Sequence, residues 1–335
     1  MHLCPSPARR ALLTLVCGAA LLAGYATQAA RAADAWPSRN IRLVIPYAPG
    51  NAGDVTFRLI QADLEKRLGA RFYIDNKSGA SGNIGAEDVV RAAPDGYTLL
   101  LGATNNFVMN QYLTKGLRYD PLKDLAPITK VNLAPSVVVV NTSLPVNSLS
   151  ELTAYAKANP GKLNFGTPGN GTPPHLTGVL YAQMTQTEMV HVPFRGAPPA
   201  VQALLANDVQ IFFASAGIST VAGHLAAGKL KALAVADTQR LAALPSVPTT
   251  AEQGLPDLRT GNWWGLAAPV GTDPAILEKI AAAVKASVSS PEIVARFNEL
   301  GLSGVGNTPA EFAAQNAREA AVWQATISKA NIQVD

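Results

Sequence analysis

The segment PYAPGNAGD, at positions 46–54, could bind an anion without a lysine or arginine. It lies between a predicted strand and a predicted helix, and the first turn of a helix has unpaired N–H groups and a partial positive charge. Glycines let a ligand approach those groups closely. Asp54 is expected to cap the helix by accepting a backbone N–H. The ligand-binding residues that this pattern predicts are Gly50, Asn51 and Gly53.

A second segment, FGTPGNGTPPH at positions 165–175, repeats this pattern after another predicted strand. Thr172 is expected to cap the following helix, and Pro173 suits its first position. Each segment alone could be an ordinary turn, but two long ones in equivalent places favour ligand binding. The predicted binding residues here are Thr167, Gly169, Asn170, Gly171, Thr172 and His175.

Signals for catalysis or metal binding are weak. The chain has no GxSxG, Walker A or GxGxxG motif, and His175, His191 and His224 are not at metal-ligand spacing. An exported hydrolase or isomerase using His175 with Thr167 or Ser215 is the alternative function. A helical histidine in this position more often packs or caps, so neither a catalytic residue nor a metal or cofactor is expected.

The N-terminal residues have the pattern of a secretory signal peptide, assigned to residues 1–32. Arg9 and Arg10 precede an apolar run at 11–24, and small residues near Ala32 suit cleavage there. Both cysteines lie in this segment, so the mature chain would lack thiols and disulfides. Its removal lowers the net charge from +4 to +1, which removes the support for nucleic-acid binding. A periplasmic location is expected.

Strands and helices alternate in two runs, one before residue 130 and one between 150 and 240, which predicts two α/β domains. Buried extended segments at 137–140 and 262–269 are predicted to cross between them. The predicted domains are 33–135 with 262–335, and 136–261, with a ligand cleft between them and a hinge at the crossings. Predicted strands are 42–46, 72–76, 97–102, 162–166, 189–193, 210–214 and 231–236; the last helices are 274–290, 291–300 and 309–330.

Several motifs resemble the Bug family, the extracytoplasmic substrate-binding proteins of tripartite tricarboxylate transporters. They are NKSGASGNIGAEDVVRAAPDGYTLLLG at 76–102, KLNFGTPGNGTPPHL, HVPFRGAPPAVQALL, GKLKALAV, RLAALPSVPTTAEQGLP and WWGLAAPVGTD, which cover the mature chain in order. The resemblance implies a type II periplasmic binding fold, with two mainly parallel sheets flanked by helices and joined by two crossing strands.

The resemblance also implies a function: a small carboxylate is held between the two loops for a transporter's membrane subunits or a sensor protein. The chain is expected to act as a monomer without a cofactor. The first loop departs from the family in having Asn51 and Ala52 after Gly50, and Gln210 replaces a common aspartate. The sequence therefore does not identify the ligand. A structural or signalling protein with a vestigial cleft is a third possibility. The resemblance also implies that Tyr47, Ala48 and Asp54 belong to the first binding loop. It adds these rim residues: Thr104, Asn105, Asn106, Arg195, Gly196, Ser215, Ala216 and Gly217.

Overall fold

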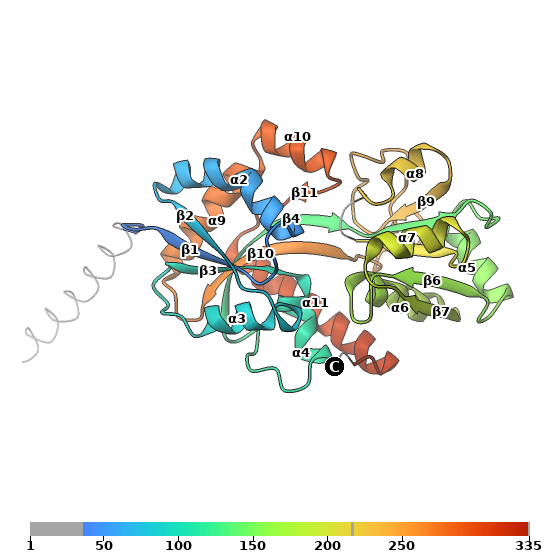
Figure 1. The fold of residues 1–335 in the computed structure, drawn as a ribbon, viewed down its shortest axis with the longest axis horizontal. Helices are drawn as coiled ribbons and strands as arrows, with labels where there is room; N and C mark the ends of the chain where they lie inside the picture. The colour runs from blue at the N-terminus through green and yellow to red at the C-terminus, as the bar shows by residue number, and fades with distance from the viewer. Residues whose placement is uncertain (1–35, 216–217, 334–335) are drawn as a thin grey trace, which may run out of the picture.

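A computed structural model describes residues 36–215 and 218–333, which form two lobes side by side (Figure 1). The first lobe contains a six-stranded sheet in the order β11-β4-β10-β3-β1-β2. The strands β1, β2 and β3 pair in parallel, whereas β10 runs antiparallel to β3 and β4. Its strands are β1 (Ile41–Ile45), β2 (Phe72–Asn76), β3 (Thr98–Ala103), β4 (Leu125–Pro135), β10 (Gly261–Pro269) and β11 (Ser303–Gly304).

The second lobe contains a five-stranded sheet in the order β7-β6-β8-β5-β9. Here β6 pairs in parallel with β7 and β8, and β5 runs antiparallel to β8 and β9. The α/β architecture with two sheets agrees with the predicted fold class, but the prediction that each sheet is mainly parallel is wrong for the strand pairing, because β4, β5 and β10 pair antiparallel with their neighbours. Its strands are β5 (Val137–Asn141), β6 (Leu163–Thr167), β7 (Met189–Pro193), β8 (Ile211–Ala214) and β9 (Leu230–Val235).

Helices cover both faces of each sheet because the central strands are apolar on both faces. In β1, Leu43 joins the cluster of buried residues from α2, α9 and α10, whereas Val44 joins the cluster that includes α3 and α11. The helices of the first lobe are α2 (Ala52–Leu68), η1 (Ala80–Gly82), α3 (Asn83–Val90), the π-helical turn η2 (Asn105–Met109), α4 (Asn110–Leu113), α9 (Pro274–Val288), α10 (Pro291–Glu299) and α11 (Pro309–Ala330). Those of the second lobe are α5 (Leu149–Ala158), α6 (Pro173–Thr185), α7 (Ala197–Leu205) and α8 (Ala222–Ala226).

The chain crosses from one sheet to the other at a single residue, Ser136, between β4 and β5. Its backbone N–H donates to the Thr260 carbonyl at 2.8 Å, and its carbonyl accepts from the Ala236 N–H at 2.8 Å. The segment 137–140 is a fully buried strand, as predicted, but it lies inside the second sheet, between β8 and β9. The crossing therefore lies just before it, and β10 returns the chain to the first sheet.

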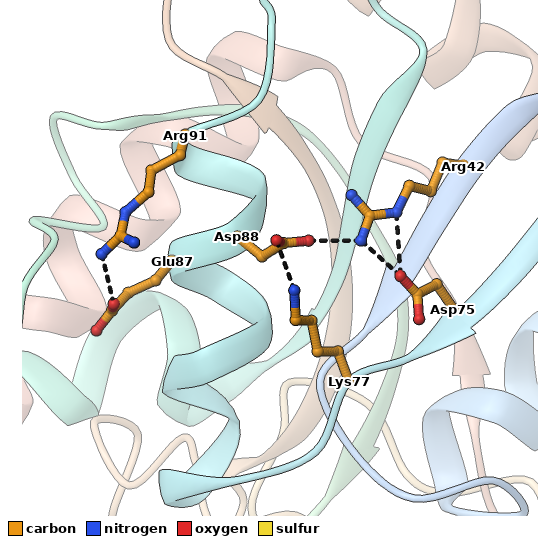
Figure 2. Close-up of polar contacts among 6 residues, drawn as sticks. All are labelled: Arg42, Asp75, Lys77, Glu87, Asp88 and Arg91. Carbon is orange, nitrogen blue, oxygen red and sulfur yellow. Dashed lines mark hydrogen bonds and ion pairs between the residues drawn. The ribbon is translucent and has the colours of Figure 1, made fainter.

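An ionic cluster fixes α3 against the start of the first sheet (Figure 2). Arg42 of β1 bridges Asp75 of β2 and Asp88 of α3, each at 2.5 Å, and Lys77 reaches the other oxygen of Asp88 at 2.6 Å. Burial alone would raise the pKa of Asp88, but the hydrogen bonds from Lys77 and Arg42 hold that pKa below its usual value. The partly buried Asp88 carboxylate therefore ties α3 to β1 and to Lys77, which follows β2.

Among residues 36–215 and 218–333, no helix has the length and apolar character needed to cross a membrane. The predicted signal peptide lies outside the described residues.

Candidate functional site

The first predicted loop enters α2 through an asparagine cap. Asn51 has an extended backbone, with φ −67° and ψ 169°, and its Oδ1 accepts the N–H groups of Gly53 at 2.7 Å and Asp54 at 3.2 Å. The prediction that Asp54 caps this helix is wrong. The α2 helix begins at Ala52, so Asn51 occupies the cap position and Asp54 already lies in the first turn.

The Asp54 carboxylate, in the first turn of α2, instead accepts a hydrogen bond from the loop that precedes the helix. Its Oδ2 accepts the Gly50 N–H at 3.0 Å and the Arg58 Nε–H at 3.0 Å. Burial would raise the pKa of Asp54, but the hydrogen bonds from Arg58 and Gly50 hold it below its usual value. Gly50 has a left-handed backbone, with φ +78°, which lets its N–H turn back toward this carboxylate. The Gly50 N–H is thus occupied within the loop.

The loop rests on the indole of Trp264 in β10. A Cβ added to Gly53 would lie 2.4 Å from Trp264 Cζ3, so glycine is required here by the close approach of the ring. The ring of Tyr47 meets Trp264 edge-on, with centroids 5.4 Å apart. Two predicted site residues, Gly53 and Tyr47, therefore place this loop directly against a crossing strand.

The predicted site residues after β3 make two different sets of contacts. The Tyr47 hydroxyl lies 2.9 Å from Asn105 Oδ1 and 3.0 Å from Asn106 Oδ1, and burial raises the pKa of Tyr47 to about 12. Thr104 is buried, and its Oγ1 accepts the Trp263 N–H at 2.8 Å. The structure thus brings Tyr47, Asn105 and Asn106 together, whereas Thr104 joins η2 to β10.

The second predicted loop is closed by its own hydrogen bonds before α6. Thr172 stands at the N-cap position, as predicted, but its hydroxyl donates to the Gly169 carbonyl at 2.7 Å and accepts no helix N–H. The predicted side-chain cap is therefore wrong. The Gly171 N–H donates to His175 Nδ1 at 3.1 Å, so His175 satisfies part of the loop. Gly169 and Gly171 have positive φ angles of 146° and 68°.

His175 stacks on His191, with ring centroids 3.8 Å apart and planes 11° apart. Burial lowers the pKa of each ring to about 4. For His175, the neighbouring His191 is a second cause of this lowering. Both rings are therefore neutral at pH 7. His175 Nδ1 accepts from Gly171, so its ring proton lies on Nε2. His191 Nε2 lies 2.6 Å from Thr167 Oγ1, which links β7 to the loop. Sequence reasoning did not place His191 in the site.

The remaining predicted residues lie around the second lobe. The Gly196 N–H donates to the Pro168 carbonyl at 3.1 Å, which ties the turn before α7 to the second loop. Arg195 is exposed, and Ser215 is buried at the end of β8. The predicted residues Ala216 and Gly217 lie outside the described residues.

A pocket of about 180 Å³ lies between the first loop and the crossing strands. It contains Gly50 of the predicted set and reaches Ser219 of the second lobe. Sequence reasoning missed Asn132, whose Nδ2 donates to Thr56 Oγ1 at 2.9 Å. An asparagine within the otherwise apolar end of β4 was the available signal. The lining residues are Gly50, Ala52, Val55, Thr56, Asn132, Ala134, Ser219, Asn262, Trp264, Leu300 and Leu302.

Some backbone donors of the two loops remain available to a ligand. Within the described part of the chain, no acceptor is hydrogen-bonded to the N–H of Ala52, Asn170 or Thr172. Neither loop contains a lysine or arginine. The same residue ranges contain no cluster of three histidine, cysteine or acidic side chains that could hold a metal ion.

Comparisons with known proteins agree with this architecture. Residues 56–332 match the family TctC, "Tripartite tricarboxylate transporter family receptor". A Pseudomonas sp. (strain P51) protein from the tcbD-tcbE intergenic region is 33% identical over 97% of this chain and 96% of its own length. BugT of Bordetella pertussis is 34% identical over 83% of this chain and 85% of its own length.

Two solved structures have a similar fold over nearly their whole length. A TctC solute-binding protein from Polaromonas has a TM-score of 0.79 at 32% identity, with 88% of this chain and 99% of that chain covered. MatC of Rhodopseudomonas palustris, solved with malate, has a TM-score of 0.68 at 31% identity, with 87% and 100% covered. The chain therefore belongs to the tripartite tricarboxylate transporter receptor family, a family of solute-binding proteins, as its resemblance to the Bug proteins predicts.

Proposed function

We propose that the protein captures a small carboxylate between the loops 47–54 and 166–172 and delivers it to a tripartite tricarboxylate-type transporter or a sensor. The observation that carries the proposal is the set of backbone N–H groups at Ala52, Asn170 and Thr172, which have no partner among the residues that the structure describes. They lie at the starts of α2 and α6, where the helix dipoles favour an anion. No lysine or arginine in either loop competes for this role.

A few such donors are sufficient for useful affinity. A hydrogen bond to a charged group contributes roughly 1.5–3 kcal/mol. Micromolar binding corresponds to about −8 kcal/mol, and part of the gross interaction offsets the entropy lost on association. Three backbone donors, with an added contact from the exposed Asn170 side chain, therefore account for binding in this range.

The solved relatives suggest which ligands to test first. MatC was solved with malate, and another Rhodopseudomonas palustris protein, 32% identical and with a TM-score of 0.72, was solved with adipate. It covers 89% of this chain and its own full length. We infer a small dicarboxylate as the first class to examine here. Native mass spectrometry of freshly purified protein would identify a ligand that co-purifies.

The proposal includes closure of the domains 33–135 with 262–335 and 136–261 around the ligand. A ligand shifts this equilibrium only by binding the closed form more tightly. We expect the radius of gyration from small-angle scattering to fall at saturating ligand. An unchanged radius with calorimetrically confirmed binding would exclude closure.

The proposal also includes export to the periplasm as a monomer, with cleavage near Ala32. The motivation is the arginine pair, the apolar run and the small residues at 30–32. Intact-mass measurement on periplasmic material is expected to show a chain that starts near Ala33. Retention of the initiator methionine would contradict export with cleavage, and light scattering would test the oligomeric state.

No turnover of the ligand is expected. The lone pair of His175 Nδ1 is occupied by the Gly171 N–H, so this nitrogen is not available as a general base in the described arrangement. Incubation of malate with the protein should return it unchanged by chromatography. A new product at a rate that depends on protein concentration would favour the hydrolase or isomerase instead.

Three variants test the loop mechanism directly. Gly50→Asp and Gly171→Asp place a negative charge in each loop and are expected to abolish malate binding. Arg58→Ala leaves the Gly50–Asp54 hydrogen bond in place and is expected to weaken binding little. Calorimetry would measure affinity, with thermal unfolding to confirm the fold. Normal binding by both glycine variants, with loss in Arg58→Ala, would replace the backbone mechanism with a side-chain ion pair.

A further inference from the structure

A larger pocket, of about 540 Å³, lies on the opposite face of the crossing strand β10 from the smaller pocket. Side chains alternate across a strand, and Gly261 and Trp263 line the large pocket, whereas Asn262 and Trp264 line the small one. The two pockets share no lining residue. The large pocket is lined by three cationic and three anionic side chains, which are Lys130, Arg259, Arg318, Asp237, Asp257 and Glu319.

Lys130 of β4 is the unusual residue in this pocket. Only 5% of its surface is exposed, and its Nζ forms no hydrogen bond or ion pair with any described residue. The ammonium lies 5.5 Å from the ring centroid of Trp263. Burial lowers the pKa of Lys130, and the charges of Glu319 and Asp237 oppose this effect. A buried charge without a close partner is costly, and an anion that entered the pocket would compensate it.

The rest of the pocket restricts which anion would fit. Trp263 and Trp323 supply flat apolar surface, and both are nearly fully buried. Glu319 is held in place by the Trp263 Nε1–H at 2.9 Å and the Gln315 amide at 2.6 Å. Together with Asp237 and Asp257 it balances the formal charges of Lys130, Arg259 and Arg318 in the lining, so a ligand with several negative charges would leave a large excess of negative charge.

We propose that this pocket is a second ligand site, which binds a small aromatic monocarboxylate with its carboxylate on Lys130 and its ring along Trp263. A single carboxylate satisfies the lysine and adds only one negative charge to this balanced lining. The ring occupies apolar surface that the first loop does not offer. The site is distinct from the loop site of the proposed function, and it stands if that function fails.

The pocket also joins the two lobes. Asp237 and Thr238 follow β9 of the second sheet, whereas Lys130 and Trp263 belong to the first sheet. A ligand here contacts both lobes beside the crossing at Ser136. Its occupancy is therefore linked to the relative position of the lobes and, through it, to the loop site.

Benzoate is the probe for this site, with benzyl alcohol as its neutral counterpart. Titration calorimetry on the full mature chain is expected to show benzoate binding that is weakened about tenfold or more in Lys130→Met, by the loss of a hydrogen bond to a charged group. Lys157→Met, which removes an exposed lysine on α5, is the matched control and should bind normally. Benzyl alcohol should bind the unaltered protein at least about tenfold more weakly than benzoate for the same reason.

A second variant covers the case in which Lys130→Met does not fold. Val322→Trp fills the pocket from the exposed face of α11 and should weaken benzoate binding while leaving the lysine in place. Absence of benzoate binding to the unaltered protein would overturn the proposal. The proposal would also be overturned if Lys130→Met bound benzoate with the affinity of the unaltered protein. It would equally be overturned if malate competed directly with benzoate and a crystal structure placed benzoate at the two loops.

Discussion

Ala52→Pro is the most selective test of the backbone-donor mechanism, because it removes one N–H group and leaves the helix intact. Ala52 is the first residue of α2, and proline is favoured at this position, where no intrahelical acceptor is lost. The preceding Asn51 has φ −67° and ψ 169°, which is a conformation compatible with a following proline. The substitution therefore targets the ligand and not the fold.

The expected loss follows from one charge-assisted hydrogen bond. Such a bond contributes roughly 1.5–3 kcal/mol, which corresponds to an affinity loss of about 10- to 150-fold. The free energy of unfolding should change by less than about 1 kcal/mol, because proline at the first helical position also reduces the entropy of the unfolded chain. Binding and stability thus separate in this variant.

The assay is titration calorimetry with malate, accompanied by urea unfolding. Ala52→Val adds two carbons but keeps the N–H group, so it controls for the volume of the proline ring at the pocket wall. We expect Ala52→Val to bind at least about fivefold more tightly than Ala52→Pro. If Ala52→Pro binds malate with the affinity of the unaltered protein, the Ala52 N–H does not contact the ligand and the reasoning is refuted.

Three further predictions concern stability. The pKa of His175 is about 4 in the folded chain, so as pH falls below about 6.5 the unfolded chain binds a proton before the folded chain does. The free energy of unfolding, measured with urea at each pH, should therefore decrease by up to about 3 kcal/mol between pH 6.5 and 4. The variant His191→Gln should show a shallower decrease, and an equal slope would exclude the stacked pair as its source. Gly53→Val should lower the free energy of unfolding by at least about 2 kcal/mol, because the valine Cβ would overlap the Trp264 ring, and the thermal midpoint should fall accordingly. An unchanged midpoint would show that the loop moves freely. Asp88→Asn should lower the free energy of unfolding, measured by chemical denaturation, by about 1–3 kcal/mol. No measurable loss would mean that the ion-pair energy of the cluster is offset by the cost of desolvating its charges.

Regular periodicity made much of the fold predictable. The strands at 72–76 and 189–193 and the helix at 309–330 have the predicted bounds, because each combines a clear hydrophobic period with glycine, proline or a capping residue at its ends. The strand β4 was not predicted. Its sequence, LAPITKVNLAP, contains prolines, a lysine and an asparagine, which suit an irregular strand with bulges beside β10.

The loops of the candidate site were predictable, but their internal hydrogen bonds were not. Asn51 and Asp54 are both good capping residues, and the choice between them depends on where the backbone enters the helix. The contact of Asn132 with Thr56 spans 76 residues, and no local pattern indicates it. The stacking of His175 on His191 likewise depends on the pairing of β6 with β7.

The position of β10 in the first sheet constrains the order in which the protein folds. This strand lies between β3 and β4, yet it begins 136 residues after β4 begins, from Leu125 to Gly261, once the whole second sheet has been synthesised. Until residue 269 is available, β3 has one unpaired edge and β4 lacks both of its neighbours, whereas the second sheet already has all of its strands. Unpaired strand edges promote association between chains. A nascent or partly translocated chain is therefore most prone to aggregate before β10 is available, and the second lobe is the part that can fold first.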